Sequence, residues 1–206
     1  PKSATFRTVD VVGLDTLVHV ANGIRENCPK DERLELFELP DFITSMMEKK
    51  WLGSKTEQGF YKKSVSTEGK KEILSLDLNT LEYRSAKRAK FDTLELTKTV
   101  DKVVDRFKIL VSGKDKAGEF YRKSFTALFA YVSNRIPEIT NDLYKIDDAM
   151  KAGFGWEHGP FQIWDAIGVD KGIELMKAEG LEPAVWVNEM LASGSTSFYS
   201  IKEGAT

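Results

Sequence analysis

The chain has 206 residues, of which 41% are hydrophobic and 30% are charged, a composition typical of a folded globular protein. Thirty basic residues against 32 acidic ones give a formal net charge of -2, which argues against the strongly basic surface of a nucleic-acid-binding protein. No apolar run approaches the ~18–20 residues that span a bilayer. We therefore expect neither a nucleic-acid partner nor a membrane partner.

The chain has one cysteine and two histidines, and they lie far apart in the sequence. Cys28 has no second cysteine with which to form an internal disulfide, which favours a reducing compartment. His19 and His158 do not have the spacing of metal ligands. These residues predict a cytoplasmic protein without a metal site.

Helical periodicity dominates the first sixty residues. Apolar residues recur at three-to-four-residue spacing from Val11 to Ile24, with Asp10 near the expected helix start and Pro29 after its end. A second amphipathic helix is predicted to begin at Pro40-Asp41 and to end near Gly53. Its methionine and aromatic stripe is interpreted as a packing face.

The pattern changes to alternation between Gly59 and Tyr83. This predicts a short antiparallel ribbon of two or three strands, with turns at Gly69 and at Asn79-Thr80. A polar, cationic connector follows over residues 84–90. We interpret it as a solvated linker, and the alternative is a surface that contacts phosphate groups.

Helical periodicity returns after the connector. One helix is predicted from Leu94 to Leu110, with Gly113 as its stop. Another helical segment is predicted to begin at Gly118 and to continue, with a kink or a helix start at Pro137, as far as Phe154. Short helices and glycine-containing turns follow it. The predicted fold class is therefore mainly α, with a small β ribbon in the middle.

The sequence also contains an internal repeat. Residues 6–15 and residues 161–170 share the pattern Phe-x3-Asp-x2-Gly-aliphatic-Asp. The glycine of each copy is expected to close a short helix, since a residue without Cβ adopts positive φ at low cost. Asp15 and Asp170 are expected to serve as N-caps of the helices that follow.

A weaker echo extends the repeat, because Ser197-Phe198-Tyr199 resembles Gly59-Phe60-Tyr61. Two related helical units thus flank the ribbon and the connector. The second unit is preceded by a predicted helical segment, residues 120–154, whose counterpart in the first unit would lie before Pro1. We therefore expect the first copy to be truncated at its start.

These residues carry a family resemblance. The segment Gly53-Ser-Lys55-Thr56-Glu-Gln-Gly59-Phe60-Tyr61 resembles the pattern Gly-x-Lys-Thr-Gly-x-Gly-Phe-Tyr of the C-terminal domain of 3-hydroxyacyl-CoA dehydrogenases, with Glu57 in place of the first inner glycine. The second copy resembles the same domain through Asn134-Arg135, Ile146-Asp147-Asp148-Ala149-Met150, Gly153-Phe154-Gly155 and Gly159-Pro160-Phe161.

The resemblance implies two related helical domains of the 6-phosphogluconate dehydrogenase C-terminal-like type, joined by the ribbon and linker. We assign residues 1–63 to the first domain, truncated at its start, residues 64–113 to the ribbon and linker helix, and residues 114–206 to the second domain. Such tandem domains pack as a pseudo-dimer in bifunctional 3-hydroxyacyl-CoA dehydrogenase/enoyl-CoA hydratase proteins, to which this arrangement is similar.

The implied function is that of an NAD-dependent (S)-3-hydroxyacyl-CoA dehydrogenase of fatty-acid β-oxidation. In that family a Rossmann domain binds NAD and carries the His and Glu of acid/base catalysis. This sequence has no Gly-x-Gly-x-x-Gly, and its nearest segment, residues 153–159, has no preceding strand and the wrong final spacing. We expect a fragment that is inactive alone, with acyl-CoA and the absent Rossmann domain as partners in the parent protein.

Asn134 is the one candidate for a catalytic residue. No cofactor-binding or metal-binding residue is assigned. The family has an Asn-Arg pair near the start of this domain whose asparagine lines the active site. The alternative is a polar helix residue that bonds to nearby backbone. His19 and His158 are expected to pack or lie half-exposed, and the connector is a second candidate for contact with the phosphates of coenzyme A.

Two other functions stay open. One is a stand-alone, non-catalytic helical dimerisation or interaction module, for which apolar surface left uncovered by the missing segment would favour self-association. The other is a related 6-phosphogluconate-dehydrogenase-type helical domain with another substrate. The Lys55-Thr56 to Tyr61 and Gly159-Pro160-Phe161 matches argue against the latter.

Overall fold

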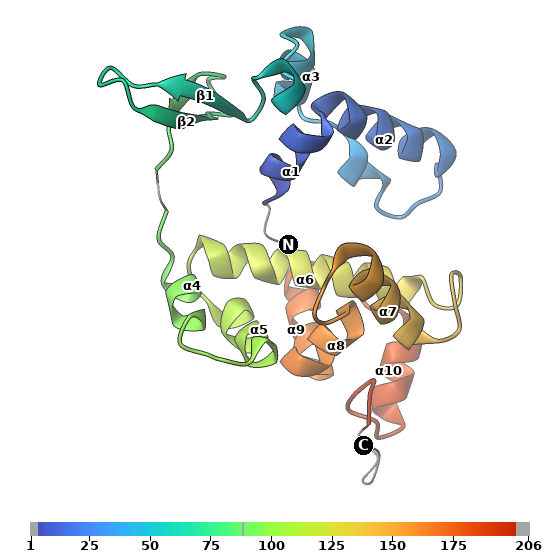
Figure 1. The fold of residues 1–206 in the computed structure, drawn as a ribbon. Coiled ribbons are helices and arrows are strands. Elements are labelled where there is room, and N and C mark those ends of the chain that lie inside the picture. Colours follow the sequence, from blue (N-terminus) through green and yellow to red (C-terminus); the bar gives the residue numbers. More distant parts are fainter. Residues whose placement is uncertain (1–3, 88, 201–206) are drawn as a thin grey trace. The chain divides into compact units, whose positions relative to one another are not determined.

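The computed structural model describes residues 4–87 and 89–200. The chain divides into two compact units, unit 1 (Pro1–Arg88) and unit 2 (Ala89–Thr206), which Figure 1 traces from blue to red. Ten α-helices and one three-stranded sheet occur in the described residues. The predicted class, mainly α with a small β ribbon, is confirmed. The expected truncation before Pro1 falls outside the described residues.

Unit 1 begins with two helices where the apolar periodicity predicted one. Gly13, at φ 112° and ψ 132°, lies between them, so Asp10 stands inside the first helix and not at a helix start. The break is the one that the repeat predicted, since this φ favours glycine. The helical elements of unit 1 are α1 (Thr5–Val12), α2 (Leu14–Asn27), η1 (Leu34–Phe37), α3 (Asp41–Glu48) and η2 (Ser54–Thr56).

The predicted N-caps were wrong. Gly13 is the N-cap of α2, and Gly168 is the N-cap of α9 (Val169–Ala178), so Asp15 and Asp170 are the second residues of their helices and lie in the first turn. Each glycine is the C-cap of one helix and the N-cap of the next. The second helix of each pair therefore begins closer to the N-terminus than predicted. Both carboxylates still lie where the positive end of the helix dipole favours them.

The ribbon forms as predicted, with three strands. The strands β1 (Tyr61–Val65), β2 (Lys71–Leu76) and β3 (Tyr83–Ser85) pair antiparallel in that order. Gly69 has φ 77° in the first turn. In the second turn the Asp77 carboxylate accepts a hydrogen bond from the Asn79 amide at 3.0 Å, which is the local bond expected of such a turn.

Helices and ribbon of unit 1 share one core. Its buried members come from α2, α3, the loop before β1 and the end of β2: Leu14, Ile43, Met46, Phe60 and Leu76. The methionine and aromatic stripe of α3 is thus a packing face, as predicted.

Unit 2 is entirely helical in its described residues. Its helices are α4 (Asp92–Thr97), α5 (Val103–Ser112), α6 (Lys116–Asn134), α7 (Leu143–Phe154), α8 (Pro160–Ile167), α9 and α10 (Val185–Ala192).

Two predicted helical segments of unit 2 are interrupted, one where no break was predicted and one near Pro137, where a kink or helix start was predicted. The helix from Leu94 to Leu110 breaks between α4 and α5, where the Arg106 guanidinium donates a hydrogen bond to the Val100 carbonyl at 2.7 Å. The segment predicted to run on to Phe154 breaks after α6, shortly before Pro137, which has no amide hydrogen to continue a helix.

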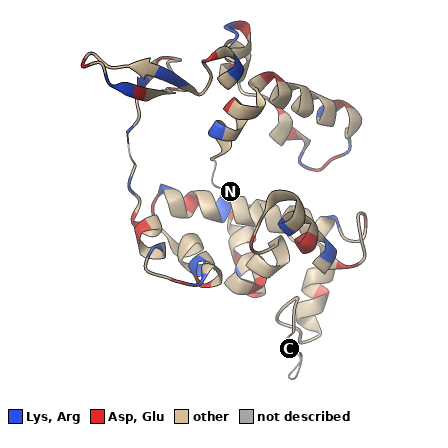
Figure 2. Ribbon diagram, viewed as in Figure 1, with Lys and Arg blue, Asp and Glu red and all other residues tan. Residues whose placement is uncertain are grey.

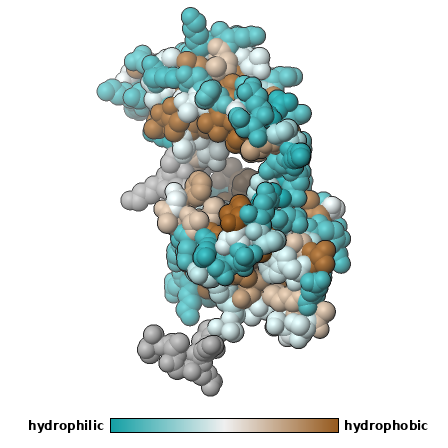
Figure 3. Space-filling model, turned by 90° about the vertical axis from the view of Figure 1, so that its right-hand side faces the viewer, coloured by the Kyte–Doolittle hydropathy of each residue, from teal (hydrophilic) through white to brown (hydrophobic). Residues whose placement is uncertain are grey.

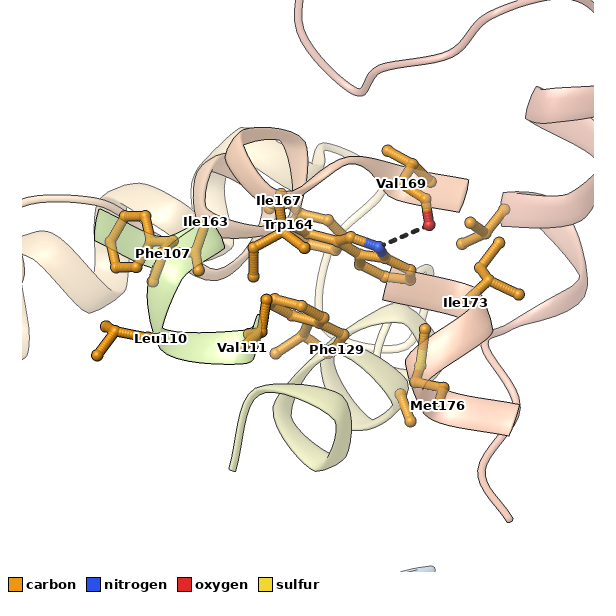
Figure 4. Packing of buried hydrophobic residues seen from close by; sticks show 14 residues of the cluster. Phe107, Leu110, Val111, Phe129, Ile163, Trp164, Ile167, Val169, Ile173 and Met176 are labelled. Atoms are coloured by element: carbon orange, nitrogen blue, oxygen red, sulfur yellow. Dashed lines mark hydrogen bonds between the residues drawn. The ribbon is translucent and has the colours of Figure 1, made fainter. Parts of the chain in front are cut away.

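The core of unit 2 is built around one tryptophan. Trp164 lies parallel to Phe129 with ring centroids 4.9 Å apart, and its indole donates a hydrogen bond to the Val169 carbonyl at 3.0 Å (Figure 4). A Cβ at Gly172 would stand 2.1 Å from the indole nitrogen, so α9 approaches the ring only because this residue is glycine.

The predicted segments 1–63, 64–113 and 114–206 do not coincide with the packing units. The ribbon belongs to unit 1, whereas α4 and α5 belong to unit 2, and α5 packs on α6 and α8. In the connector, Arg84 lies in β3 and pairs with Asp77 at 3.0 Å, and Arg88 lies outside the described residues. Figure 2 shows basic and acidic residues interspersed over both units. None of the described helices is long and apolar enough to cross a membrane.

Candidate functional site

In unit 2, one half-buried carboxylate holds a distant loop against a helix. Asp165 of α8 accepts hydrogen bonds from the amide of Phe198 at 2.8 Å and from the amide of Tyr199 at 3.0 Å, one on each oxygen. Burial raises the pKa of Asp165, and these two bonds oppose the rise. Paired amides on one carboxylate make a specific joint between segments far apart in the chain.

Unit 1 contains the same joint. Asp10 of α1 accepts from the amide of Phe60 at 2.8 Å and from the amide of Tyr61 at 2.9 Å. The helix in each case ends at a glycine of nearly equal conformation, φ 112° at Gly13 and φ 106° at Gly168. The repeat seen in the sequence is therefore a repeat of structure, and the weak echo between residues 59–61 and 197–199 marks the loop that each aspartate holds.

Two glycines of the first motif pack directly on its aspartate. A Cβ at Gly59 would lie 2.1 Å from Asp10 Oδ1, and a Cβ at Gly53 would lie 2.4 Å from the Asp10 carbonyl oxygen. Neither position has room for a side chain. The glycines of the Gly53–Tyr61 motif thus let the loop approach α1 closely enough for the joint to form.

The polar residues of the same motif hold the loop in shape. Lys55 Nζ lies 2.6 Å and 2.5 Å from the two carboxylate oxygens of Asp15 in α2, and this hydrogen bond is the main cause that lowers the pKa of Asp15. Thr56 Oγ1 accepts from the Leu52 amide at 3.0 Å. Glu57 has φ 59°, in the left-handed region, which explains why the family pattern has glycine at that position.

A third carboxylate is found in unit 2. Asp147 of α7, 1% exposed, accepts from the amides of Phe161 and Gln162 at 2.9 Å and 3.0 Å and from the Tyr199 hydroxyl at 2.8 Å. It thus supplies acceptors to the first turn of α8, where backbone amides lack helical partners. A Cβ at Gly159 would lie 2.3 Å from the Asp147 Cβ.

Tyr199 connects the two carboxylates of unit 2. Its amide bonds Asp165 and its hydroxyl bonds Asp147. Burial raises the pKa of Asp147, and burial together with the Asp147 hydrogen bond raises that of Tyr199 far above its usual range. Every one of these polar groups is engaged with backbone or with another member, so the cluster holds α7, α8 and the segment at 198–199 together.

Asn134 is the last residue of α6 and is half-buried. The residues beside it anchor the end of the helix. Ser133 accepts from the Ala184 amide at 3.0 Å through its hydroxyl and from the Trp186 indole at 2.9 Å through its carbonyl. Arg135 lies 5.0 Å above the Tyr131 ring. Among the described residues, no hydrogen bond joins Asn134 to the aspartates of the joints.

The two histidines have different surroundings. His158 packs edge-on against Phe107 with centroids 5.8 Å apart, as expected of a packing residue. Its Nε2 lies 3.8 Å from Glu157 Oε1, too far for the hydrogen bond of a catalytic pair. His19 lies exposed on α2, and Cys28 is exposed as well. In the part of the chain that the structure describes, no three His, Cys, Asp or Glu residues gather as metal ligands.

The glycine-rich segment at residues 153–159 does not fit NAD. Gly155, at φ 64°, ends α7, and the chain then enters α8. A dinucleotide site needs the glycines between a parallel strand and a helix. The described strands form an antiparallel ribbon in unit 1, so the described residues supply no such turn.

Unit 1 also contains a cavity that the sequence did not predict. It has a volume of about 430 Å³ and is bordered by α1, the Gly53–Tyr61 loop and the ribbon. Arg7, Lys62 and Lys63 are among its lining residues, together with Asp10 and Tyr61. The sequence signal that could have drawn attention here is the aspartate that recurs within the apolar pattern of both repeats.

Comparison with known proteins matches these features to one family. Residues 1–63 and 117–197 match the family described as 3-hydroxyacyl-CoA dehydrogenase, C-terminal domain. Both matched stretches contain the aspartate of a joint and the glycine that follows it, and the amides of Phe198 and Tyr199 lie just after the second stretch.

Several curated relatives carry related names. The chain is 44% identical, over all its 206 residues, to a "Probable 3-hydroxyacyl-CoA dehydrogenase" of Bacillus subtilis, of which it covers 25%. It is 28% identical over 79% of its length to a "Putative fatty acid oxidation complex trifunctional enzyme" of Rickettsia felis, of which it covers 21%. The chain thus spans about a quarter of the length of these relatives. Family match and identity together show that this chain belongs to the 3-hydroxyacyl-CoA dehydrogenase C-terminal domain family.

Proposed function

We propose that this chain is the helical C-terminal part of an NAD-dependent (S)-3-hydroxyacyl-CoA dehydrogenase of fatty-acid β-oxidation. In that role it forms a wall of the acyl-CoA cleft and the scaffold between the domains of the parent protein. One observation carries the proposal: Asp10, Asp147 and Asp165, which lie in the matched segments, direct their oxygens to backbone amides and one tyrosine hydroxyl. Carboxylates engaged in this way hold a fold and are not open for proton transfer.

NAD, in this proposal, is bound by a Rossmann domain of the parent protein. When bound there, NAD accepts the hydride from the carbon that bears the 3-hydroxyl group. The residues of this chain shape and hold the cleft wall. The names of the relatives from Bacillus subtilis and Rickettsia felis support both the dehydrogenase and the fatty-acid pathway. We place the parent protein in the cytoplasm because Cys28 is a free thiol.

Asn134 is the proposed point of contact with substrate. Its position at the end of α6, beside the anchored Ser133, would hold an amide at a fixed place at the edge of unit 2. In the parent protein, Asn134→Ala should raise KM for the acyl-CoA or lower kcat if this copy lines a cleft. If Asn134 has only a structural role, the substitution should lower the stability of unit 2 and leave both constants unchanged.

The function is tested by comparing this chain with the longer parent protein, which in this proposal includes the Rossmann domain. Both are assayed with acetoacetyl-CoA and NADH, following NADH absorbance, and NAD binding is measured by calorimetry. We expect turnover and NAD binding from the parent-length protein and neither from the 206-residue chain. NAD-dependent turnover by the pure chain would contradict the proposal.

A second candidate is a stand-alone helical interaction module. Exposed apolar residues of α1 and α2 favour it, since such surfaces often mark protein contacts: Phe6, Val11, Val12, Leu17 and Val20. The genomic reading frame discriminates between the two. A Rossmann-encoding sequence continuous with this one supports the dehydrogenase, and a reading frame limited to these residues supports the module.

A further inference from the structure

Unit 1 repeats a set of hydrogen-bond donors that a carboxylate binds in unit 2. In unit 2, the Asp147 carboxylate accepts hydrogen bonds from two amides in the first turn of α8 and from the Tyr199 hydroxyl. The corresponding atoms of unit 1 are the amides of Phe6 and Arg7 in α1 and the hydroxyl of Tyr61. In residues 4–87, no carboxylate accepts a hydrogen bond from any of these three groups.

The backbone of the two sites is closely similar. The residue before α1, Ala4, has φ -79° and ψ 158°, and the residue before α8, Gly159, has φ -79° and ψ 171°. Each tyrosine is fixed by the aspartate of its joint through its own amide, Tyr61 by Asp10 at 2.9 Å. The backbone that carries the donors bound to Asp147 in unit 2 therefore has a similar conformation in unit 1.

Apolar exposure differs between the units in the manner expected of an uncovered site. Phe6 is 43% exposed, whereas its counterpart Phe161 is fully buried. Val12 is 57% exposed, whereas its counterpart Ile167 is 5% exposed. Figure 3 shows hydrophobic residues gathered on the surface of the unit that contains α1 and α2. In unit 2, α5, α6 and α7 pack on α8 and remove this surface from water.

Charge at the site suits a carboxylate. The cavity that borders Tyr61 is lined by three basic residues, Arg7, Lys62 and Lys63, and by two acidic ones, Asp10 and Glu57. Asp10 already accepts hydrogen bonds from the amides of Phe60 and Tyr61, and the positive end of α1 adds to the basic side chains. The helix that fills the unit 2 site carries two adjacent acidic residues, Asp147 and Asp148, on a segment with Ile146 and Met150. Apolar cover and a buried carboxylate thus arrive on one helix.

We infer that the open face of α1 docks an amphipathic helix of the α7 type, whose aspartate carboxylate binds the amides of Phe6 and Arg7 and the hydroxyl of Tyr61. The occupant is defined by its chemistry: one carboxylate flanked by apolar residues at helical spacing. The inference does not depend on the dehydrogenase function, because it follows from comparing two halves of one chain.

The experiment supplies such a helix in cis. Since Gly159 corresponds to Ala4, residues 142–159 are copied in front of Thr5 in the full chain, replacing residues 1–4. Hydrogen exchange of residues 5–12 is followed by mass spectrometry, and peptides of α8 serve as an internal control for folding. We expect exchange in α1 to slow by about tenfold or more, as for amides newly bonded to a buried carboxylate.

Two variants separate the carboxylate from the apolar cover. Asp147→Asn within the graft should remove most of the protection, and Tyr61→Phe should remove part of it while leaving the Asp10 joint in place. Equal protection in the Asp147→Asn graft, or none in any graft while α8 stays protected, would overturn the inference.

Adding the helix as a separate peptide tests the inference even if the grafted chain misfolds. A peptide of residues 142–159 is titrated into the unmodified chain, and the amide shifts of Phe6 and Arg7 are followed by NMR. Saturable shifts that the Asp147→Asn peptide does not produce support the inference. Sedimentation of the unmodified chain tests for a second copy as occupant: a dimer that already protects α1 would overturn the inference, and a monomer with exposed α1 supports it.

Discussion

At the residue scale, single atoms decide which amino acids the motif accepts. Gly59 has no room for a Cβ, because the Asp10 carboxylate oxygen stands 2.1 Å from where it would be. Glu57, two residues earlier, has a side chain and holds it in the left-handed region at φ 59°. One glycine of the family pattern is therefore required by packing, and the other is favoured only by backbone conformation.

The two positions predict opposite results of substitution. Gly59→Ala should destabilise unit 1 by about 1–3 kcal/mol or more, because the methyl group must displace the Asp10 carboxylate from its amides. Glu57→Gly, the matched change in the same loop, should alter stability by less than about 1 kcal/mol, since relief of strain and loss of chain rigidity oppose each other. Urea unfolding of both variants gives the comparison. A Gly59→Ala protein as stable as the parent chain would show that the loop is not held as described.

At the element scale, sequence reasoning found the elements and missed their ends. The ribbon was predictable because alternation and turn residues are local signals. The interruption between α4 and α5 was not, because Val100 keeps the apolar phase across it and the Arg106 bond to its carbonyl depends on folding. The Asp147–Tyr199 hydrogen bond joins residues far apart in the chain, so no local pattern could have revealed it.

Another joint between elements makes stability depend on pH. Asp115, the N-cap of α6, accepts from the Gly118 amide at 3.0 Å and from the Thr93 amide and hydroxyl of α4 at 3.0 Å and 2.8 Å. These bonds, the Gly118 amide first, lower the pKa of Asp115 to about 2 from an ordinary 3.8. Since the folded pKa is the lower one, the stabilisation is present above the unfolded pKa and is lost as pH falls through the folded pKa.

We therefore expect Asp115→Asn to flatten the pH dependence of unit 2 between about pH 4 and pH 2. Asparagine can still cap α6, but its amide nitrogen cannot accept a hydrogen bond from Thr93. Urea unfolding at several pH values measures the difference between parent chain and variant. This comparison removes the opposite contribution of Asp147 and Asp165, whose pKa values burial raises. Parallel curves for the two proteins would contradict the assignment.

At the scale of the whole molecule, the two copies of one motif have cores of unequal size. Among the described residues, the cluster of buried hydrophobic side chains has five members in unit 1 and fourteen in unit 2. Because buried apolar area is the main favourable term in folding, unit 1 should be the less stable unit. Its open α1 face, with Phe6 and Val12 exposed, has the same cause, since the helices that cover α8 in unit 2 have no counterpart among residues 4–87.

This inequality predicts two unfolding transitions. Hydrogen exchange in rising urea should release the amides of α2 and α3 before those of α6 and α8, because each cluster is made within one unit. Met46→Ala, which empties a fully buried site of unit 1, should destabilise the first transition by about 2–5 kcal/mol and leave the second in place. Ile163→Val, the control in unit 2, should shift only the second transition, by about 0.5–1.5 kcal/mol. A single transition that both substitutions move together would show that the two cores fold as one.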